Sequence, residues 1–310
     1  MPFLRSHFLK TSLLFILLVA IAYQLNFHEI ITHTKLINSS VFIITTMLMF
    51  VTILLGALRW WYVLLFLRVE ISILRVLRLY FASLFTNIVL PGSIGGEALK
   101  IWQLHKSGVS YGKALNSILL DRAAVIIATV LMVLSFGTYF IATHKIFLIP
   151  SLGSILSSVL FLAIIMLFFS IFLYKKFKNG RVANFLNNLT TDSLQLLSNQ
   201  RLSCCIIAIS LLCNCIYSVI FYWLTVSLSW DISIYSCLIL VPIINIVCYL
   251  PISYAGWGVR EIATIYGYSM LGLPKEVALI VSIVFGVQLV IGSLPGSLCI
   301  LKLDSEKLPS

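Results

Sequence analysis

Charged residues are scarce in this 310-residue chain, at 10% of the total, and acidic residues are the scarcer kind. Hydrophobic residues make up 61% and the mean hydropathy is +1.09, which excludes a water-soluble globular protein of ordinary composition. The 10 acidic residues face 21 basic ones, for a formal charge of +11. Because the basic residues lie beside apolar segments and form no groove interleaved with aromatic residues, lipid headgroups explain them better than nucleic acid does.

The chain also lacks the motifs of metal sites and of common membrane enzymes. None of its seven cysteines forms a Cys-x-x-Cys pair, and its five histidines have no zinc-site spacing. We therefore expect no metal and no cofactor, and we interpret the cysteines as small packing residues. An Asp-x-Asp motif, which often holds a metal-activated donor, is absent as well. The sequence offers no catalytic motif, and we expect a protein that is not an enzyme.

Long apolar segments recur along the chain, and a transmembrane helix needs about 20 such residues. We predict an all-α, polytopic membrane protein that forms a single transmembrane domain over residues 1–310, with no soluble domain. The first apolar segment follows basic residues, so a cleavable signal peptide is an alternative for it, although the later spans already supply the topology. Continuous spans are expected near residues 11–26, 39–58, 113–141, 152–174, 203–228 and 276–301.

Two further apolar segments, 79–106 and 232–273, contain nearly the same interruption. Both interruptions read Leu-Pro-x-Ser-x-x-Gly, at residues 90–96 and 250–256. Proline removes a backbone donor and glycine disfavours regular helix, so each phrase should unwind a membrane segment. Paired interruptions in two halves of a membrane protein are typical of transport sites. The helix breaks are expected at Pro91, Gly92, Gly95, Gly96, Pro251, Gly256 and Gly258.

The positions of Lys and Arg predict the orientation of these segments, because cytoplasmic loops carry the excess of positive charge. Segment 79–106 becomes a re-entrant excursion from the cytoplasm, and segment 232–273 enters from the outside. Both chain termini are expected in the cytoplasm, and residues 182–200 are expected to form an interfacial amphipathic helix. The basic residues placed inside are Arg59, Arg68, Arg75, Arg78, Lys100, Lys106, Lys113, and the run Lys175, Lys176, Lys178 and Arg181.

This orientation makes the chain an inverted repeat, with one half at about 39–141 and the other at about 203–301. Short sequence matches support the repeat independently of the charges. Asn87-Ile88-Val89 and Asn245-Ile246-Val247 precede the two prolines, and the segment from Gly108 to Leu115 matches the segment from Gly272 to Leu279 at equal spacing.

Six ionisable residues lie beside the breaks or in the span after the first break. They are Glu97, Lys100, Asp121, Arg122, Arg260 and Glu261. Unrelieved near the bilayer centre, they would cost on the order of 15 to 20 kcal/mol together. Sequence neighbours on a helix point about 100° apart, so we expect partners from other segments. The preferred pairs are Arg122 with Glu97 or Glu261, and Arg260 with Asp121. A network of ion pairs that only fixes helix packing is the structural alternative.

The functional interpretation adds the backbone. A short helix should begin near Glu97 and another near Val259, and helix N-termini present N–H groups that favour anions. Together with the nearby cations they predict a phosphate-sized site near the midplane, where the glutamates hold the basic residues when no ligand is present. The expected substrate-binding residues are Glu97, Lys100, Asp121, Arg122, Arg260, Glu261, Ser93 and Ser253.

The run "LPGSIGGEALKIWQLHKSGVSYGKALNSILLDR" from Leu90 to Arg122, with "PISYAGWGVREIATIYGYSMLGL" from Pro251 to Leu273, resembles the lysylphosphatidylglycerol synthase transmembrane-region family of flippase-like membrane proteins. The resemblance covers most of the chain from about residue 40. It implies a multi-pass protein of a bacterial or archaeal inner membrane that moves an anionic or lipid-linked substrate between leaflets. Synthases of that name continue into a soluble aminoacyl-transferring domain, whereas this chain ends at Ser310, so synthase activity is not expected.

Three functions follow as hypotheses. The first is a flippase or transporter for a phosphorylated or anionic lipid, with membrane lipids as its partners. The second is a membrane glycosyltransferase that uses a polyprenyl-phosphate donor, which the missing Asp-x-Asp motif disfavours. The third is a non-transporting membrane partner of a separate lipid-modifying synthase. The sequence leaves a homo-oligomer open and favours no nucleic-acid partner.

Overall fold

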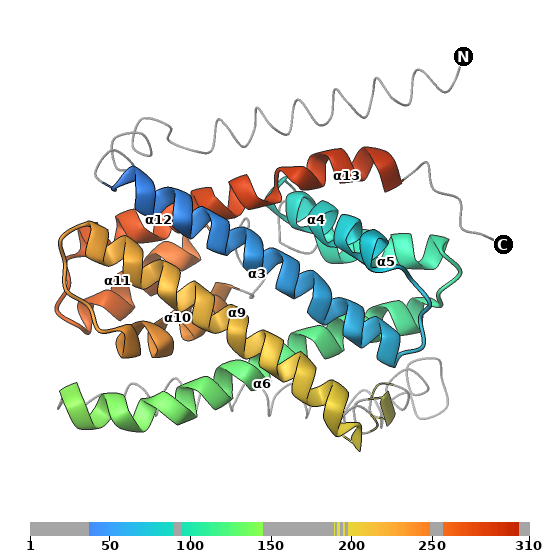
Figure 1. The fold of residues 1–310 in the computed structure, drawn as a ribbon, viewed down its shortest axis with the longest axis horizontal. Helices are drawn as coiled ribbons and strands as arrows, with labels where there is room; N and C mark the ends of the chain where they lie inside the picture. Colours follow the sequence, from blue (N-terminus) through green and yellow to red (C-terminus); the bar gives the residue numbers. More distant parts are fainter. Residues whose placement is uncertain are drawn as a thin grey trace, which may run out of the picture.

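The computed structural model describes residues 37–89, 95–144, 198–248 and 257–303, with 189, 191, 192 and 195 between them; side chains are described up to 137 and 301 in the second and last ranges. These residues contain no strand, and the predicted all-α fold is confirmed (Figure 1). The expected spans at 11–26 and 152–174, and most of the expected interfacial helix at 182–200, lie outside the described residues.

The described chain has two halves with the same order of helices. The first half contains α3 (Ser39–Phe66), α4 (Ile73–Val89), α5 (Gly95–Lys106) and α6 (Tyr111–His144). The second half contains α9 (Gln200–Ser227), α10 (Ile234–Cys248), α11 (Val259–Ser269), α12 (Lys275–Ser293) and α13 (Pro295–Leu303). Four helical segments in the described residues are long and apolar enough to cross a membrane, namely α3, α6, α9 and the run through α12 and α13. The spans expected at 39–58, 113–141, 203–228 and 276–301 are thus confirmed as helices of membrane-crossing length.

The two 28-residue helices, α3 and α9, begin and end in the same way. Asn38 and Asn199 are their N-caps, and each side chain accepts a hydrogen bond from a backbone N–H of the first turn. The residues after their C-caps, Arg68 and Ser229, both have positive φ, at 54° and 63°. A helix of this length is about 42 Å long, which exceeds the roughly 30 Å of a hydrocarbon core, so its ends reach beyond the apolar layer or the helix tilts.

Two fixed sequence offsets, which differ by three residues, relate the helices of the two halves. The starts of α3 and α9, and of α4 and α10, are 161 residues apart, and the starts of α5 and α11, and of α6 and α12, are 164 residues apart. Gly108 and Gly272, which precede α6 and α12, are also 164 apart and have φ of +85° and +73°. The sequence match from Gly108 follows this register, whereas Asn87 and Asn245 are 158 apart and do not occupy equivalent positions.

The contacts between helices repeat in the same way. Each main contact between two helices has a counterpart between the equivalent helices of the other half. The equivalent helices are α3 and α9, α4 and α10, α5 and α11, and α6 and the α12–α13 run. For example, α6 packs on α10 as α13 packs on α4, and α6 packs on α9 as α12 packs on α3. The central contact, α3 against α9, maps onto itself. The halves therefore differ in side chains more than in architecture.

The paired short helices lie toward opposite ends of the bundle (Figure 1). In that view α3 runs from left to right and α9 from right to left, the hairpin of α4 and α5 lies to the right, and the hairpin of α10 and α11 lies to the left. Each hairpin is preceded and followed by a long helix of its own half. The two Leu-Pro-x-Ser-x-x-Gly phrases lie in sequence between the helices of each hairpin, except that Gly95 and Gly96 already belong to α5. Residues 90–94 and 249–256 lie outside the described residues.

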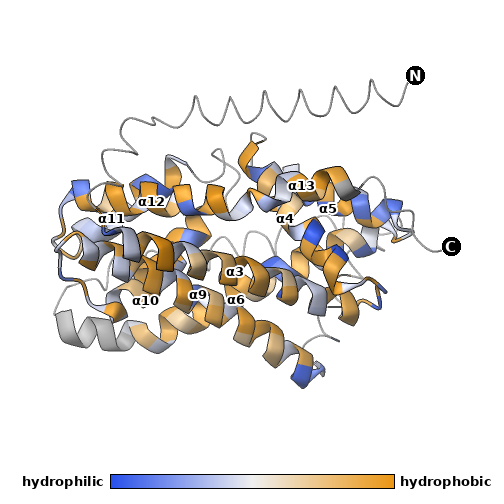
Figure 2. Ribbon diagram, turned by 45° about the horizontal axis from the view of Figure 1, so that its top comes forward, coloured by the Kyte–Doolittle hydropathy of each residue, from blue (hydrophilic) through white to orange (hydrophobic). Residues whose placement is uncertain are grey.

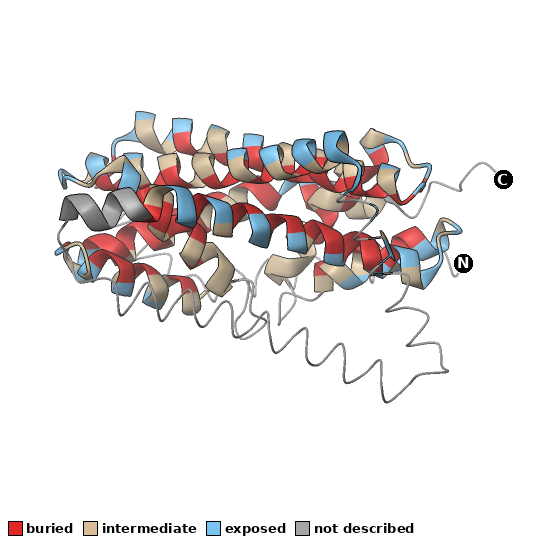
Figure 3. Cartoon of the chain, turned by 90° about the horizontal axis from the view of Figure 1, so that it is seen from below, coloured by how far each residue is buried: buried red, intermediate tan, exposed pale blue. Residues whose placement is uncertain are grey.

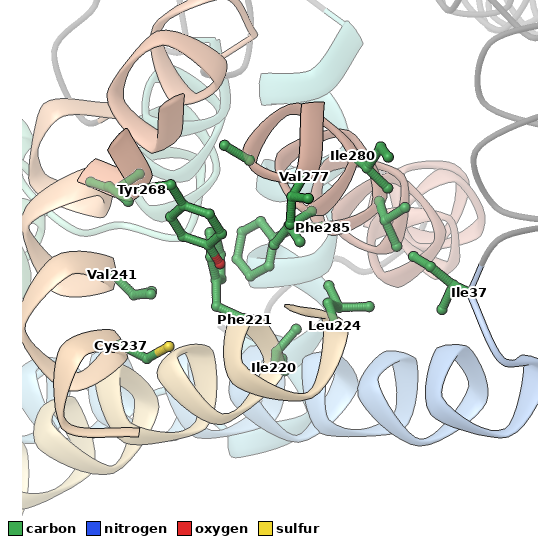
Figure 4. Packing of buried hydrophobic residues seen from close by; sticks show 14 of the residues in the cluster. Ile37, Ile220, Phe221, Leu224, Cys237, Val241, Tyr268, Val277, Ile280 and Phe285 are labelled. Carbon is green, nitrogen blue, oxygen red and sulfur yellow. The ribbon is translucent and has the colours of Figure 1, made fainter. Parts of the chain in front are cut away.

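Buried residues lie on the sides of the helices that face their neighbours, and exposed residues alternate with them along the outer helices (Figure 3). The largest apolar cluster joins α9 to α12 around Phe221 and Phe285, whose ring centroids are 4.9 Å apart (Figure 4). Tyr268 enters the same cluster, with its hydroxyl 2.7 Å from Thr225 Oγ1. Hydrophobic residues also cover most of the length of the long helices on the outside (Figure 2). An apolar outer surface on an apolar core is the pattern of a protein embedded in lipid.

Candidate functional site

A cavity of about 420 Å³ lies where the two hairpins meet the long helices. Its volume is in the range of ligand sites, which are about 300–1,000 Å³. Both halves contribute to its wall, and most of the ionisable residues expected to bind substrate line it. The lining residues that carry charge are Arg59, Glu97, Lys100, Asp121, Arg122 and Arg260, and the main polar and aromatic ones are Tyr80, Ser83, Asn87, Tyr217, Asn245, Trp257 and Phe285.

In the first half, Glu97 joins two cations. It lies in the first turn of α5 and forms a salt bridge with Arg122 from α6, as one of the two expected pairings required. Lys100, one turn further along α5, lies 3.4 Å from the other carboxylate oxygen. The ammonium of Lys100 is buried between the rings of Trp60 and Tyr80, 4.8 and 4.6 Å from their centroids. Arg122 is the more accessible cation, since its side chain is 36% exposed.

Asp121 does not pair with Arg260, and that expectation was wrong. Its partner is Arg59 of α3, with Nε 2.6 Å from Oδ1 and Nη2 3.1 Å from Oδ2. This two-pronged geometry is the strongest form of an Arg–carboxylate pair. Arg59 had been assigned to the cytoplasmic end of a span that was expected to stop at residue 58. The helix continues to Phe66, which places the guanidinium inside the bundle.

In the second half, Arg260 pairs with its own neighbour. Its Nη2 lies 3.5 Å from Glu261 Oε1, although sequence neighbours were expected to find partners elsewhere. The pairing is possible because Glu261 bends back over the start of α11, where it accepts a hydrogen bond from the backbone N–H of Gly258. Ser282 of α12 donates to the same carboxylate at 3.2 Å. The guanidinium of Arg260 lies 5.1 Å from the centroid of the Trp257 ring.

With Arg59 included, the cluster has four basic residues and three acidic ones. The basic residues are those of the cavity wall, and Glu261 joins the two acidic residues of the wall through its contact with Arg260. The expected balance of three against three is thereby corrected to an excess of one positive charge. A cavity with uncompensated positive charge, removed from bulk water, favours an anion.

Three buried donor groups of the wall have no hydrogen-bond partner within the described part of the chain. They are the hydroxyl of Ser83, the amide nitrogen of Asn245 and Nε of Arg260. Unsatisfied buried polar groups are costly, and they commonly mark a place where a ligand or water binds. A fourth such atom of the wall, Oε2 of Glu97, is an acceptor, but it already faces the ammonium of Lys100 at 3.4 Å. The three donors favour a ligand with acceptor oxygens.

Two glycines permit this arrangement by leaving space. A side chain on Gly96 would meet the backbone carbonyl of Ser83, so α5 packs directly against α4, and the Gly96 N–H donates to Asn87 Oδ1 at 2.7 Å. A side chain on Gly286 of α12 would meet the guanidinium of Arg260 and the Trp257 ring. Gly96 was expected as a helix break. The role of Gly286 was not anticipated.

The structure thus brings together Glu97, Lys100, Asp121, Arg122 and Arg260 around one cavity, with Glu261 directly behind. Of the expected breaks, Gly95 and Gly96 are the first residues of α5, which begins slightly earlier than expected, and Gly258 is the N-cap of α11, which begins at Val259 as expected. The remaining predicted site and break residues lie outside the described residues: Pro91, Gly92, Ser93, Pro251, Ser253 and Gly256.

Comparison with known proteins agrees with this picture. The family model described as lysylphosphatidylglycerol synthase TM region matches residues 8–296. The chain belongs to this family. Membership makes it a membrane protein of a family named for lipid metabolism, and the match includes both hairpins and every residue of the charged cavity.

The chain is also similar to the UPF0104 membrane protein PH1989 of Pyrococcus horikoshii. The two are 30% identical over 139 residues, which is 44% of this chain and 41% of that protein. The matched segment therefore spans less than half the length of the relative. No solved structure matches the chain.

Proposed function

We propose that this protein moves a lipid with an anionic or phosphate-bearing headgroup between the two leaflets of a membrane. The observation that carries the proposal is the cavity whose wall joins four basic residues to three buried donors that have no partner among the described residues. In this mechanism the headgroup passes through the cavity, while the acyl chains remain in lipid along the apolar outer surface. The chain itself catalyses no reaction.

The depth of the cavity supports this proposal. Arg59 lies 7 residues before the end of α3, which corresponds to about 10 Å along the helix axis. Gly286 lies 11 residues after the start of α12, at the other end of the bundle, which corresponds to about 16 Å. The charged wall thus lies away from both ends of the helix bundle, and ionisable residues inside a membrane bundle usually mark a transport pathway.

The placement of the hairpins supports a gated path open in turn to either side. In this mechanism the α4–α5 hairpin is re-entrant from the cytoplasm, because Arg68, Arg75 and Lys106 cluster at its open end and such charges favour the inside. The α10–α11 hairpin is then re-entrant from the outside, and the two halves form an inverted repeat. The protein resides in a bacterial or archaeal inner membrane with both termini in the cytoplasm.

The proposal is tested by reconstitution into vesicles of phosphatidylcholine and phosphatidylglycerol that contain a trace of fluorescent acyl-labelled phosphatidylglycerol. Added dithionite bleaches only the outer leaflet, so label in the inner leaflet is lost only if lipid crosses the bilayer. We expect the wild type to expose the inner pool, and Arg122→Ala and Arg260→Ala to leave it protected. Arg201→Ala is the matched control, since Arg201 is exposed in the first turn of α9 and does not line the cavity.

The outcome that contradicts the proposal is equally specific. If wild-type vesicles bleach no faster than protein-free ones with labelled phosphatidylglycerol, phosphatidylethanolamine or a polyprenyl phosphate, the protein moves none of these lipids. If both alanine variants transport as fast as the wild type, the charged cavity is not the path.

A second role follows from the family description, which names a synthase. We propose that a separate lipid-modifying enzyme supplies the lipid that this protein moves. Cells that lack the protein should then accumulate the modified lipid in the inner leaflet, without loss of its synthesis. Loss of synthesis, with transport by the purified protein absent, would favour a non-transporting partner of the synthase instead.

A further inference from the structure

Each half has a glutamate at the equivalent position of its short helix, but the arginine that contacts this glutamate comes from a different helix in each half. Glu97 and Glu261 are 164 residues apart, which is the register of α5 and α11. Each lies in the first turn of its short helix and contacts one arginine. In the first half that arginine is Arg122, from the long helix α6. In the second half it is Arg260, from the short helix itself.

The glycines described above occupy the complementary positions. Applying the same register, Gly96 of the first half corresponds to Arg260 of the second, and Arg122 corresponds to Gly286. Each half therefore has one arginine and one glycine at this pair of positions, in opposite order. A side chain at Gly286 would point at the guanidinium of Arg260, so the arginine of the short helix occupies the space that an arginine of the long helix would fill.

We propose that each half supplies one arginine to the anionic group in the cavity, that its glutamate holds this arginine in place, and that the helix of origin has been exchanged between the halves. The inference rests on the proposed function and deepens it, since it assigns Glu97 and Glu261 as positioning residues and Gly286 as the residue that makes room for the second arginine. A headgroup phosphate bound between Arg122 and Arg260 would then contact both halves at once.

The geometry of α12 makes the exchange testable. Ser282 lies one turn before Gly286 on the same face of α12 and donates a hydrogen bond to Glu261. An arginine at position 286 would therefore lie on the helix face that contacts this carboxylate. Moving the arginine within the second half, by combining Arg260→Gly with Gly286→Arg, should therefore recreate the arrangement of the first half.

We expect Arg260→Gly to lower the initial rate of labelled-phosphatidylglycerol movement by about tenfold or more, because a charge-assisted contact is lost. Arg260→Gly/Gly286→Arg should recover most of that loss. Gly286→Arg alone should be as slow as Arg260→Gly, because two guanidinium groups then compete for one space. Recovery in the double variant would show that the site needs the guanidinium group and not the helix that carries it.

The first half provides the matched control. Moving its arginine by Arg122→Gly/Gly96→Arg should recover nothing, because a side chain at Gly96 meets the α4 backbone at Ser83. The structure thus predicts that relocation succeeds in one half and fails in the other. Recovery in the first half and not in the second would overturn the proposal.

A measurement that does not depend on transport keeps the inference separate from the proposed function. Arg260→Gly leaves Glu261 without its arginine. The melting temperature of this variant, followed by tryptophan fluorescence in detergent, should therefore be lower than that of the wild type, and the double variant should restore it. The proposed function stands if the wild type moves lipid and Arg122→Ala and Arg260→Ala do not. The inference nevertheless fails if Arg260→Gly/Gly286→Arg is folded and recovers neither transport nor melting temperature.

The conservative variants Glu97→Gln and Glu261→Gln complete the test if a relocated arginine prevents folding. Both amides keep the shape of the side chain and weaken its hold on the arginine. The proposal expects similar reductions in the transport rate from both. A reduction from one variant alone would show that the two glutamates do not have equivalent roles, and would overturn it.

Discussion

Replacing Arg59 alone by Met is expected to destabilise the protein by about 3–5 kcal/mol, because Asp121 then remains as an uncompensated charge inside the bundle. The side chains of Arg59 and Asp121 are only 7% and 6% exposed, so little solvent is available to replace the lost partner. Asp121→Leu should cost a similar amount for the same reason, since it leaves the guanidinium unpaired.

The double variant Arg59→Met/Asp121→Leu should be far more stable than the sum of the single changes predicts. An apolar pair of similar volume often replaces a buried ion pair at little cost. The second half supports this expectation, because Ile220 and Phe285 stand in register with Arg59 and Asp121 and both are packed in the apolar cluster. The coupling energy between the two changes should therefore be about 3 kcal/mol or more.

Unfolding by sodium dodecyl sulfate in mixed micelles, followed by tryptophan fluorescence, measures all three variants against the wild type. Arg201→Met serves as a control for loss of an exposed arginine. The reasoning is refuted if the double variant loses as much stability as the two single variants together, since the ion pair would then contribute no coupling.

Three further changes test local packing in the same assay. Gly96→Ala should cost about 1–3 kcal/mol, because its side chain meets the backbone carbonyl of Ser83, and an unchanged midpoint would contradict the close contact of α4 and α5. Tyr268→Phe should cost about 1–2 kcal/mol through loss of the hydrogen bond with Thr225, and no added loss should appear in a Thr225→Val background. Asn38→Ala should cost about 1 kcal/mol by removing an N-cap, whereas Asn38→Ser should restore it.

The sequence predicted the elements that depend on local composition. Uninterrupted apolar runs predicted the four long helical segments, and the glycines before Glu97 and Val259 predicted where the short helices begin to within a few residues. The pairing of Glu97 with Arg122 could be anticipated because few acidic residues are available in an apolar layer. These features follow from hydrophobicity and backbone chemistry, which a linear sequence displays directly.

The remaining features depend on how distant helices are rotated against one another. The pair of Arg59 and Asp121 joins residues 62 positions apart, and it was missed because the second span was expected to end at residue 58, whereas the helix continues to Phe66. A better signal was present, since the apolar run continues from Trp60 to Phe66. The function of Gly286 could not be predicted, because the side chain that it accommodates comes from another helix.

The correspondence of helix contacts has a consequence for how such a protein is built. One half, placed against an inverted copy of itself, would form the same pairs of helix contacts that the two halves form here. A membrane subunit of half this size, inserted in both directions, would therefore assemble as an antiparallel homodimer with two identical walls. When two such subunits are joined in one chain, the residues of the two cavity walls can differ from each other. Only then can one wall keep its buried Arg59–Asp121 pair while the other replaces it with aliphatic and aromatic side chains.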